Sequence, residues 1–288
     1  MPSTQQLKSR IRSVKSTKQI TKAMQMVAAS KMRRAQDATK ASAPYERAAN
    51  ELLSYLNSQG VTTAHKWFEI RPIKTRMIIV IASDKGLAGA FNANVLKAYI
   101  ANLRSDDADG VRNKTIAVGR KASSFVTRIK DTEIVGTYED LPDVPEGAQF
   151  HAILNTAKDA FESKEVDAVD VIYTQFVSSM NQVATVTRLF PAGFSAVAVS
   201  DAVRDATYEP SVEAVLDDVA YRLIGSRLFQ AFLDSRASEH SMRMLAMKNA
   251  TDNATDLVDD LTLEMNKARQ SAITQELSEI TAGVEAMK

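Results

Sequence analysis

The stretch that decides the fold is Val258–Met287, with the sequence VDDLTLEMNKARQSAITQELSEITAGVEAM. Its apolar residues form two stripes whose steps alternate between three and four residues, which is the spacing of a coiled-coil seam. The first stripe consists of Val258, Leu261, Met265, Ala268 and Ala272, and the second of Ile273, Leu277, Ile280, Val284 and Met287. The pattern predicts a helix whose apolar face needs a helical partner.

The N-terminal residues supply a second helix with two apolar stripes and a break around residues 15–18. One stripe is Leu7, Ile11 and Val14, and the other is Ile20, Met24, Val27 and Ala28. Methionines at helical spacing are usually core residues, so we interpret Met24, Met26 and Met32 as core. We expect Pro44, the single proline between residues 3 and 59, to kink or interrupt this helix.

Both ends of the chain lack helix breakers. No glycine lies between residues 3 and 59, and no proline lies between residues 211 and 288. This predicts long terminal helices that protrude from a smaller domain and pair with each other. The resulting domain prediction is an N-terminal helix at 1–60, a linker at 61–75, a central domain at 76–207 and a C-terminal helix at 208–288.

The centre alternates between short apolar runs and helical patterns, which is typical of an α/β domain with a parallel or mixed sheet. We predict a Rossmann-like domain inserted between the two long helices. The expected strands are 77–82, 115–118, 133–135, 168–176 and 183–189, and the expected helices are 92–103, 121–129 and 150–163.

Composition narrows the functional classes. The chain has no cysteine and only three histidines, which excludes disulfides and thiol catalysis and makes a histidine-built zinc site improbable. It has no apolar run long enough to span a membrane and no secretory signal pattern. Residues 1–60 hold eleven basic and three acidic residues, whereas residues 209–288 hold eight basic and fourteen acidic. These ends are either two solvated faces or two surfaces that attract each other.

A search for catalytic motifs finds no active site. The phosphate-loop and dinucleotide fingerprints are absent, and Gly86 with Gly89 specifies a turn and little more. Asp84 follows a strand, where capping the turn is its simplest role. Glu239 and His240 are adjacent on a helix, so their side chains diverge and do not form a catalytic pair. We predict no cofactor and no metal site.

Three hypotheses follow from different classes. The basic N-terminal helix suits either an acidic protein surface or nucleic acid, although no aromatic residue precedes Tyr45 to stack on bases. A small-molecule enzyme in the α/β domain is the third hypothesis, and it lacks the phosphate loop it would need.

Three segments resemble the gamma subunits of F-type ATP synthases. They are Ile11–Gln36 (IRSVKSTKQITKAMQMVAASKMRRAQ), Ser83–Asn92 (SDKGLAGAFN) and most of Glu239–Glu285. The chain departs from the usual family pattern at four positions: Lys85, Ala88, Ala90 and Val284. The resemblance runs over nearly the whole chain and is weakest between about residues 100 and 205.

The resemblance implies a central rotor shaft: the terminal helices form an antiparallel, left-handed coiled coil, and the α/β domain is its foot. It implies a non-catalytic subunit that transmits torque from the membrane-embedded c ring to three catalytic beta subunits. The implied partners are the alpha and beta subunits, the epsilon subunit and the c ring, with one copy per complex and no nucleic acid. The implied location is the cytoplasmic face of the bacterial plasma membrane, where the chain is peripheral and attached only through the c ring.

The family match also assigns contact residues. The implied beta-subunit contacts are Met24, Arg243, Arg269, Gln270, Thr274 and Glu276. The segment Tyr208-Glu209-Pro210 corresponds to the place where the family meets epsilon and the c ring. Lys85 and Asn92 are expected to be structural.

Overall fold

The computed structural model describes residues 4–286 except 131, 145–147, 194–196 and 210. The chain divides into two compact units. Met1–Ala28 and Arg243–Lys288 form the helix-pair unit, and Ala29–Met242 form the sheet unit. The long helices contribute to both units: α1 is Thr4–Ser58 and α6 is Val212–Ala286. Of the residues discussed above, Pro210, Met287 and the side chain of Val284 lie outside this description.

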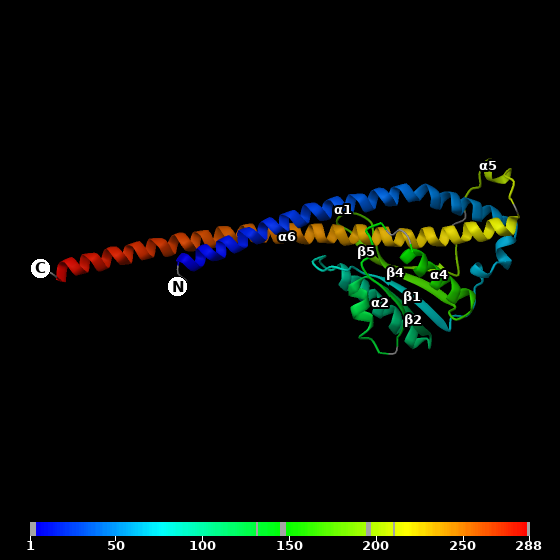
Figure 1. The fold of residues 1–288 in the computed structure, drawn as a ribbon, viewed down its shortest axis with the longest axis horizontal. Helices are drawn as coiled ribbons and strands as arrows, with labels where there is room; N and C mark the ends of the chain where they lie inside the picture. Colours follow the sequence, from blue (N-terminus) through cyan, green and yellow to red (C-terminus); the bar gives the residue numbers. More distant parts are fainter. Residues whose placement is uncertain (1–3, 131, 145–147, 194–196, 210, 287–288) are drawn as a thin grey trace. The chain divides into compact units, whose positions relative to one another are not determined.

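In the helix-pair unit, the beginning of α1 packs antiparallel against α6 (Figure 1). Leu7 and Ile11 bury against Leu261, and the Thr251 hydroxyl donates a hydrogen bond to the Thr21 hydroxyl at 2.8 Å. As residue numbers rise along α1 they fall along α6, which sets the antiparallel direction. Val14, Val258, Met265 and Ala268 pack around this core, as the stripes predict.

The predicted second stripe of α1 is wrong in part. Ile20, Met26 and Val27 are more than half exposed, whereas Thr21, Ala28 and Met32 are buried and Met24 is half-buried. The seam begun at Leu7 continues in heptads instead of breaking. Polar residues occupy several positions of this seam, so a search for apolar residues alone does not find it. Thr21 can be buried in the seam because its hydroxyl has a hydrogen-bond partner. On α6, Ala272 is exposed, so the seam ends at Ala268.

Pro44 does not interrupt α1, which continues to Ser58. Proline removes one helical hydrogen bond and disfavours the helix locally. Downstream of it, Ala49, Leu53 and Leu56 are buried in the core of the sheet unit, and this packing stabilises the last turns of the helix.

The sheet unit contains five strands in the order β3-β2-β1-β4-β5. Strands β1 to β4 are parallel where they pair, and β5 pairs antiparallel with β4. The order matches the first five strands of the doubly wound arrangement, with the last strand reversed. The strands are β1 (Thr75–Ile81), β2 (Arg112–Val118), β3 (Glu133–Tyr138), β4 (Ala168–Phe176) and β5 (Gln182–Phe190).

Helices cover both faces of the sheet. Successive side chains of β1 point to opposite faces, so they belong to two different hydrophobic cores. Ile78 and Val80 pack with α2 (Phe91–Ala108) and α3 (Arg120–Val126). Met77 and Ile79 pack with α4 (Ala148–Glu162), the first third of α6 and the end of α1. All five predicted strands and three predicted helices are confirmed within a few residues of their ends.

Three short helices in the connections have no signal in the periodicity. They are the 3-10 helices η1 (Val61–Ala64) and η2 (Lys66–Phe68), and α5 (Asp201–Arg204). Pieces of three or four residues are too short to show a helical repeat.

We predict that Leu7→Ala destabilises the helix-pair unit by about 2–5 kcal/mol, because it removes a fully buried side chain. Ile20→Ala is the control on the same helix, and it should cost less than about 0.5 kcal/mol because Ile20 is 58% exposed. Helical circular dichroism during urea unfolding measures both. Equal losses for the two variants would contradict the continuous heptad seam.

Candidate functional site

The first candidate site is the end of α6, where every residue from 269 to 282 is exposed (Figure 1, red end of α6). Four of the implied beta-subunit contacts, Arg269, Gln270, Thr274 and Glu276, lie here. An isolated amphipathic helix is marginally stable in water, and helices usually gain stability by burying an apolar stripe. Residues 269–282 have such an apolar stripe, and it is exposed to solvent.

The four polar residues border that stripe. Ile273, Leu277 and Ile280 are 50%, 59% and 64% exposed and lie along one side of the helix at 3.6 residues per turn. Arg269 and Glu276 border the stripe on one side, and Gln270 and Thr274 on the other. An apolar centre with a polar rim is the usual composition of a protein interface.

The remaining predicted contact residues differ in exposure. Met24 is half-buried and Arg243 is buried with 8% exposure, so Arg243 has less surface to offer than the exposed residues. Tyr208 is half-buried and Glu209 is exposed. Tyr208 stacks on Tyr55 of α1 with ring centroids 5.8 Å apart, and burial raises the pKa of its hydroxyl.

A second candidate site lies where α6 meets the carboxyl ends of the parallel strands, which is the usual ligand edge of an open α/β sheet. Residues 231–241 of α6 are all buried. Seven of them are polar or charged: Asp234, Ser235, Arg236, Ser238, Glu239, His240 and Ser241. We call these the polar collar; sequence reasoning missed it, because a buried helix is usually apolar.

The collar bonds to the ends of the strands and their loops. Arg236 donates to the Asp84 carboxylate at 3.4 Å, to the Leu141 carbonyl at 2.9 Å and to Glu239 at 2.9 Å. Ser238 donates to the Thr174 carbonyl of β4 at 3.1 Å. The Arg236 guanidinium therefore occupies the edge where a doubly wound sheet would bind a ligand.

Asp84 joins this edge together by bonding to residues that follow β2 and β3, and its role in capping its own turn stays a prediction. One carboxylate oxygen accepts the backbone N–H groups of Arg120 and Asp140, each at 3.0 Å, while the other accepts from Arg236. Gly119 lets the strand ends approach closely: its φ is +88°, and a Cβ there would lie 2.2 Å from the Ala82 carbonyl oxygen. The neighbouring Asn92 accepts the Ser83 backbone N–H at 3.0 Å, consistent with the structural role expected of it.

His240 extends the collar to α1 through Asp143. His240 Nε2 and Asp143 Oδ1 form a hydrogen bond of 2.9 Å, and Lys31 of α1 pairs with Asp143 at 2.9 Å. The hydrogen bond from His240, then that from Lys31, hold the pKa of the Asp143 carboxyl well below its usual range. Glu239 and His240 point to different partners, as predicted for adjacent helical residues.

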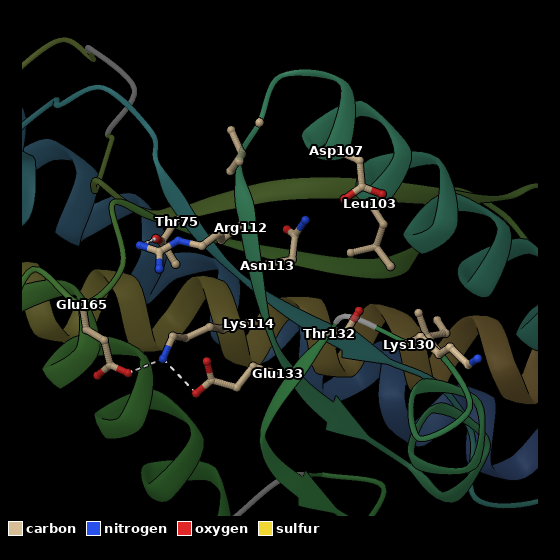
Figure 2. Close-up of a pocket in the computed structure, with 13 residues that line it drawn as sticks. Thr75, Leu103, Asp107, Arg112, Asn113, Lys114, Lys130, Thr132, Glu133 and Glu165 are labelled. Carbon is tan, nitrogen blue, oxygen red and sulfur yellow. Dashed lines mark hydrogen bonds and ion pairs between the residues drawn. The ribbon is translucent and has the colours of Figure 1, made fainter.

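A pocket of about 700 Å³ opens at the opposite, amino-terminal edge of the strands (Figure 2). Three of its charged residues pair with one another: Lys114 donates to Glu133 at 2.9 Å and to Glu165 at 2.5 Å. The hydrogen bond to Glu165 is the main reason that the pKa of Lys114 is raised. Arg112 donates to Thr75 at 3.2 Å. These contacts hold the strand starts together, at the edge away from the usual ligand site.

Within the described part of the chain, no group of three or more histidine, aspartate and glutamate side chains is arranged to hold a metal ion. Across the same residues, no helix combines the length and hydrophobicity needed to cross a bilayer.

Comparison with known proteins gives full-length matches. A family model described as ATP synthase matches residues 3–287. The chain is 38% identical over 288 residues to the ATP synthase gamma chain of Stenotrophomonas maltophilia, covering 100% of both chains. It is also 38% identical over 289 residues to the gamma chain of Paracidovorax citrulli, again covering 100% of both.

Solved structures share the fold. The rotor of the Euglena gracilis mitochondrial ATP synthase matches with a TM-score of 0.65 and 18% identity, over 94% of this chain and 98% of that one. The central stalk and c-ring structure of the Tetrahymena thermophila mitochondrial ATP synthase gives a TM-score of 0.58 at 24% identity, over 80% and 99% of the two chains.

We predict that Arg236→Met destabilises the sheet unit by about 3–5 kcal/mol, because the buried Glu239 and the partly buried Asp84 lose the cation that pairs with them. Arg120→Met is the control: Arg120 is paired with two carboxylates but is 53% exposed, so its loss should cost far less stability than the loss of Arg236. Urea unfolding of both variants measures the difference. Equal losses would show that the collar pair is no stronger than a surface pair.

Asp143→Asn should destabilise the sheet unit in a pH-dependent way. The folded-state pKa of Asp143 is lowered, so its carboxylate stabilises the fold above the unfolded pKa of about 3.9. That contribution is lost as pH falls through the lowered folded value. The unfolding midpoints of the variant and the original chain should differ fully at pH 7 and pH 5, and the difference should begin to narrow below about pH 4. A constant gap down to pH 3 would refute this origin of the stability.

Proposed function

Because this chain belongs to the ATP synthase gamma-chain family, we propose that it is the central shaft that carries torque between the c ring and the three catalytic beta subunits. In this proposal the helices at 1–60 and 208–288 form the shaft, 61–75 is a linker and 76–207 is the foot. The chain itself catalyses nothing. ATP is made or hydrolysed on the beta subunits.

The observation that carries the proposal is the exposed end of α6. Residues 269–282 leave an apolar stripe in solvent, rimmed by Arg269, Gln270, Thr274 and Glu276. Such a stripe fits the inside of a ring made by other chains. In this proposal Arg269 offers its planar guanidinium to a beta-subunit carboxylate, while Met24 and Arg243 serve a second beta contact lower on the shaft.

A two-helix shaft can drive three identical sites because it is asymmetric. The stripe lies on one side of α6, so at any moment the three beta subunits meet different faces of the helix. A partner shifts a conformational equilibrium only through contacts that differ between its states. Rotation then changes which beta subunit receives the apolar face and which receives the polar one.

The collar, in the sheet unit, supports the same function. Arg236 fills the ligand edge of the sheet and ties it to α6. A domain whose ligand edge is occupied by its own helix is suited to holding that helix. In this proposal the foot contacts epsilon and the c ring through Tyr208 and Glu209, and the chain is peripheral on the cytoplasmic face of the bacterial plasma membrane, with one copy per complex.

The purified chain should hydrolyse no ATP, and it should assemble with matching alpha and beta subunits into an active complex. Sustained ATP turnover by the chain alone, or failure to enter such a complex, would contradict the proposal. Gel filtration followed by an ATPase assay of the fractions measures both outcomes.

Changing Arg269 and Gln270 together to alanine should lower coupled turnover about tenfold. A hydrogen bond to a charged group contributes about 1.5–3 kcal/mol, and each 1.36 kcal/mol is about a factor of ten in rate. Gln275→Ala is the matched control, because Gln275 is exposed on the side of α6 away from the stripe. The control should keep the original rate, and circular dichroism should show both variants folded. An unchanged rate in the double variant would remove Arg269 and Gln270 from the contact.

A further inference from the structure

The last turns of α1 form a cradle for the segment that carries Tyr208 and Glu209. We call residues 197–209, which include α5, the foot segment (Figure 1). Three residues of α1, Glu51, Ser54 and Tyr55, contact it. Their spacing of three and four residues places them on one face of the helix. All of these residues belong to the sheet unit.

Two of the cradle residues bind the backbone of the foot segment. Glu51 accepts the Ser200 N–H at 2.8 Å, and the Ser54 hydroxyl oxygen accepts the Val197 N–H at 3.2 Å. The hydrogen bonds with Ser200 also hold the pKa of the Glu51 carboxyl below its usual range. These bonds fix the path of the chain before and at the start of α5.

The third residue, Tyr55, holds the end of the segment. Its ring stacks on Tyr208 with centroids 5.8 Å apart and planes inclined by 18°. The Tyr208 hydroxyl in turn donates to the Val203 carbonyl at 2.7 Å, so the ring that Tyr55 contacts is tied back to α5. The Tyr55 hydroxyl reaches the Arg204 carbonyl at 3.5 Å, a long bond compared with the ring stack.

This arrangement determines what the foot segment presents to solvent. Tyr208 is turned onto α1, while the next residue, Glu209, is exposed. The segment leads directly into α6, which begins at Val212. One end of the foot segment is therefore joined to α6 by the chain, and its side is joined to α1 by the cradle.

We propose that Tyr55 is a positioning residue for the foot contact: its ring fixes Tyr208, sets the exposed position of Glu209 and passes load from the foot segment into α1. This rests on the proposed function, because it takes Tyr208 and Glu209 as the contact with the c ring and epsilon. The new element is that the contact is held by α1 through the cradle, as well as by α6 through the chain.

The test uses the assembled synthase in inverted membrane vesicles and measures ions pumped per ATP hydrolysed. Tyr55→Leu should lower this ratio about threefold or more. That is the shift expected in the population of chains with Tyr208 held on α1 when one aromatic pair is lost. Tyr55→Phe keeps the ring stack on Tyr208 and should therefore keep the ratio of the original chain. Tyr45→Leu is the matched control, because Tyr45 is a half-exposed tyrosine on the same helix and should leave the ratio unchanged.

A disulfide between α1 and the foot segment tests whether Tyr55 acts by holding that segment or only by stabilising the fold. The chain has no cysteine, so Ser54→Cys with Val197→Cys introduces its only thiol pair, at a place where the Ser54 oxygen already lies 3.2 Å from the Val197 nitrogen. Oxidation should leave pumping intact in the otherwise unchanged chain. In the Tyr55→Leu background it should restore the lost pumping, and reduction should abolish the rescue. Loss of pumping on oxidation would show that the segment must leave α1 and would overturn the proposal.

Variants of Tyr208 and Glu209 test the foot contact separately from the positioning role of Tyr55. If Tyr208→Ala and Glu209→Gln lower the pumping ratio but Tyr55→Leu does not, the positioning role is refuted and the foot contact stands. If neither Tyr208→Ala nor Glu209→Gln changes the ratio, the foot contact is refuted, and the role of Tyr55 falls with it. If Tyr55→Leu and both contact variants lower it, and the disulfide rescues Tyr55→Leu, both stand.

Discussion

The burial of polar residues along one stretch of α6 is the constraint on which the sheet unit depends. Residues 231–241 are buried on every side of the helix, and Arg236 and Glu239 carry charge there. Buried polar groups are costly unless they are hydrogen-bonded. The carboxyl ends of the strands supply the partners, through Asp84, the Leu141 carbonyl and the Thr174 carbonyl. The helix is therefore held in one position on the sheet by bonds with direction, in addition to apolar packing.

The same contacts occupy the place where an α/β domain of this strand order usually binds a ligand. In open α/β sheets a ligand binds beyond the carboxyl ends of the strands. Here the Arg236 guanidinium lies at that edge and Asp84 already has three donors. Expelling the arginine would remove the positive charge beside the carboxylates of Asp84 and Glu239. The fold has kept the arrangement of a ligand-binding sheet and filled its ligand edge with its own helix.

The two units make different uses of one long helix. In the helix-pair unit α6 buries a narrow seam against α1 and then extends with an exposed apolar stripe. In the sheet unit the same helix packs on the sheet, first through its own apolar residues such as Leu223 and Phe232 and then through the collar. The proposed function uses both properties: packing on the sheet holds the helix, and the exposed stripe offers an apolar surface to another chain. The cradle of Glu51, Ser54 and Tyr55 gives α1 a comparable connection to the foot segment.

Periodicity alone was sufficient for the central elements, because strands of six to nine residues and helices of seven to eighteen repeat often enough to be recognised. It was also sufficient for the seam of Leu7, Ile11 and Leu261. Periodicity placed Ile20 and Val27 in the seam wrongly. The seam position is held by Thr21, which an apolar pattern does not include. The stripe of Ile273, Leu277 and Ile280 was visible in the sequence, and the structure shows how far it stays exposed.

The sequence by itself determined the helix periods, the alternation of strands and helices, and the family signature, because each is a local pattern of residue types. Only the tertiary structure decided that Arg236 meets Asp84, that Asp143 joins His240 to Lys31, and that Tyr208 rests on Tyr55. These partners lie about 100 residues or more apart in the chain. A charged or aromatic residue has many possible partners, and its choice depends on where the backbone brings them together.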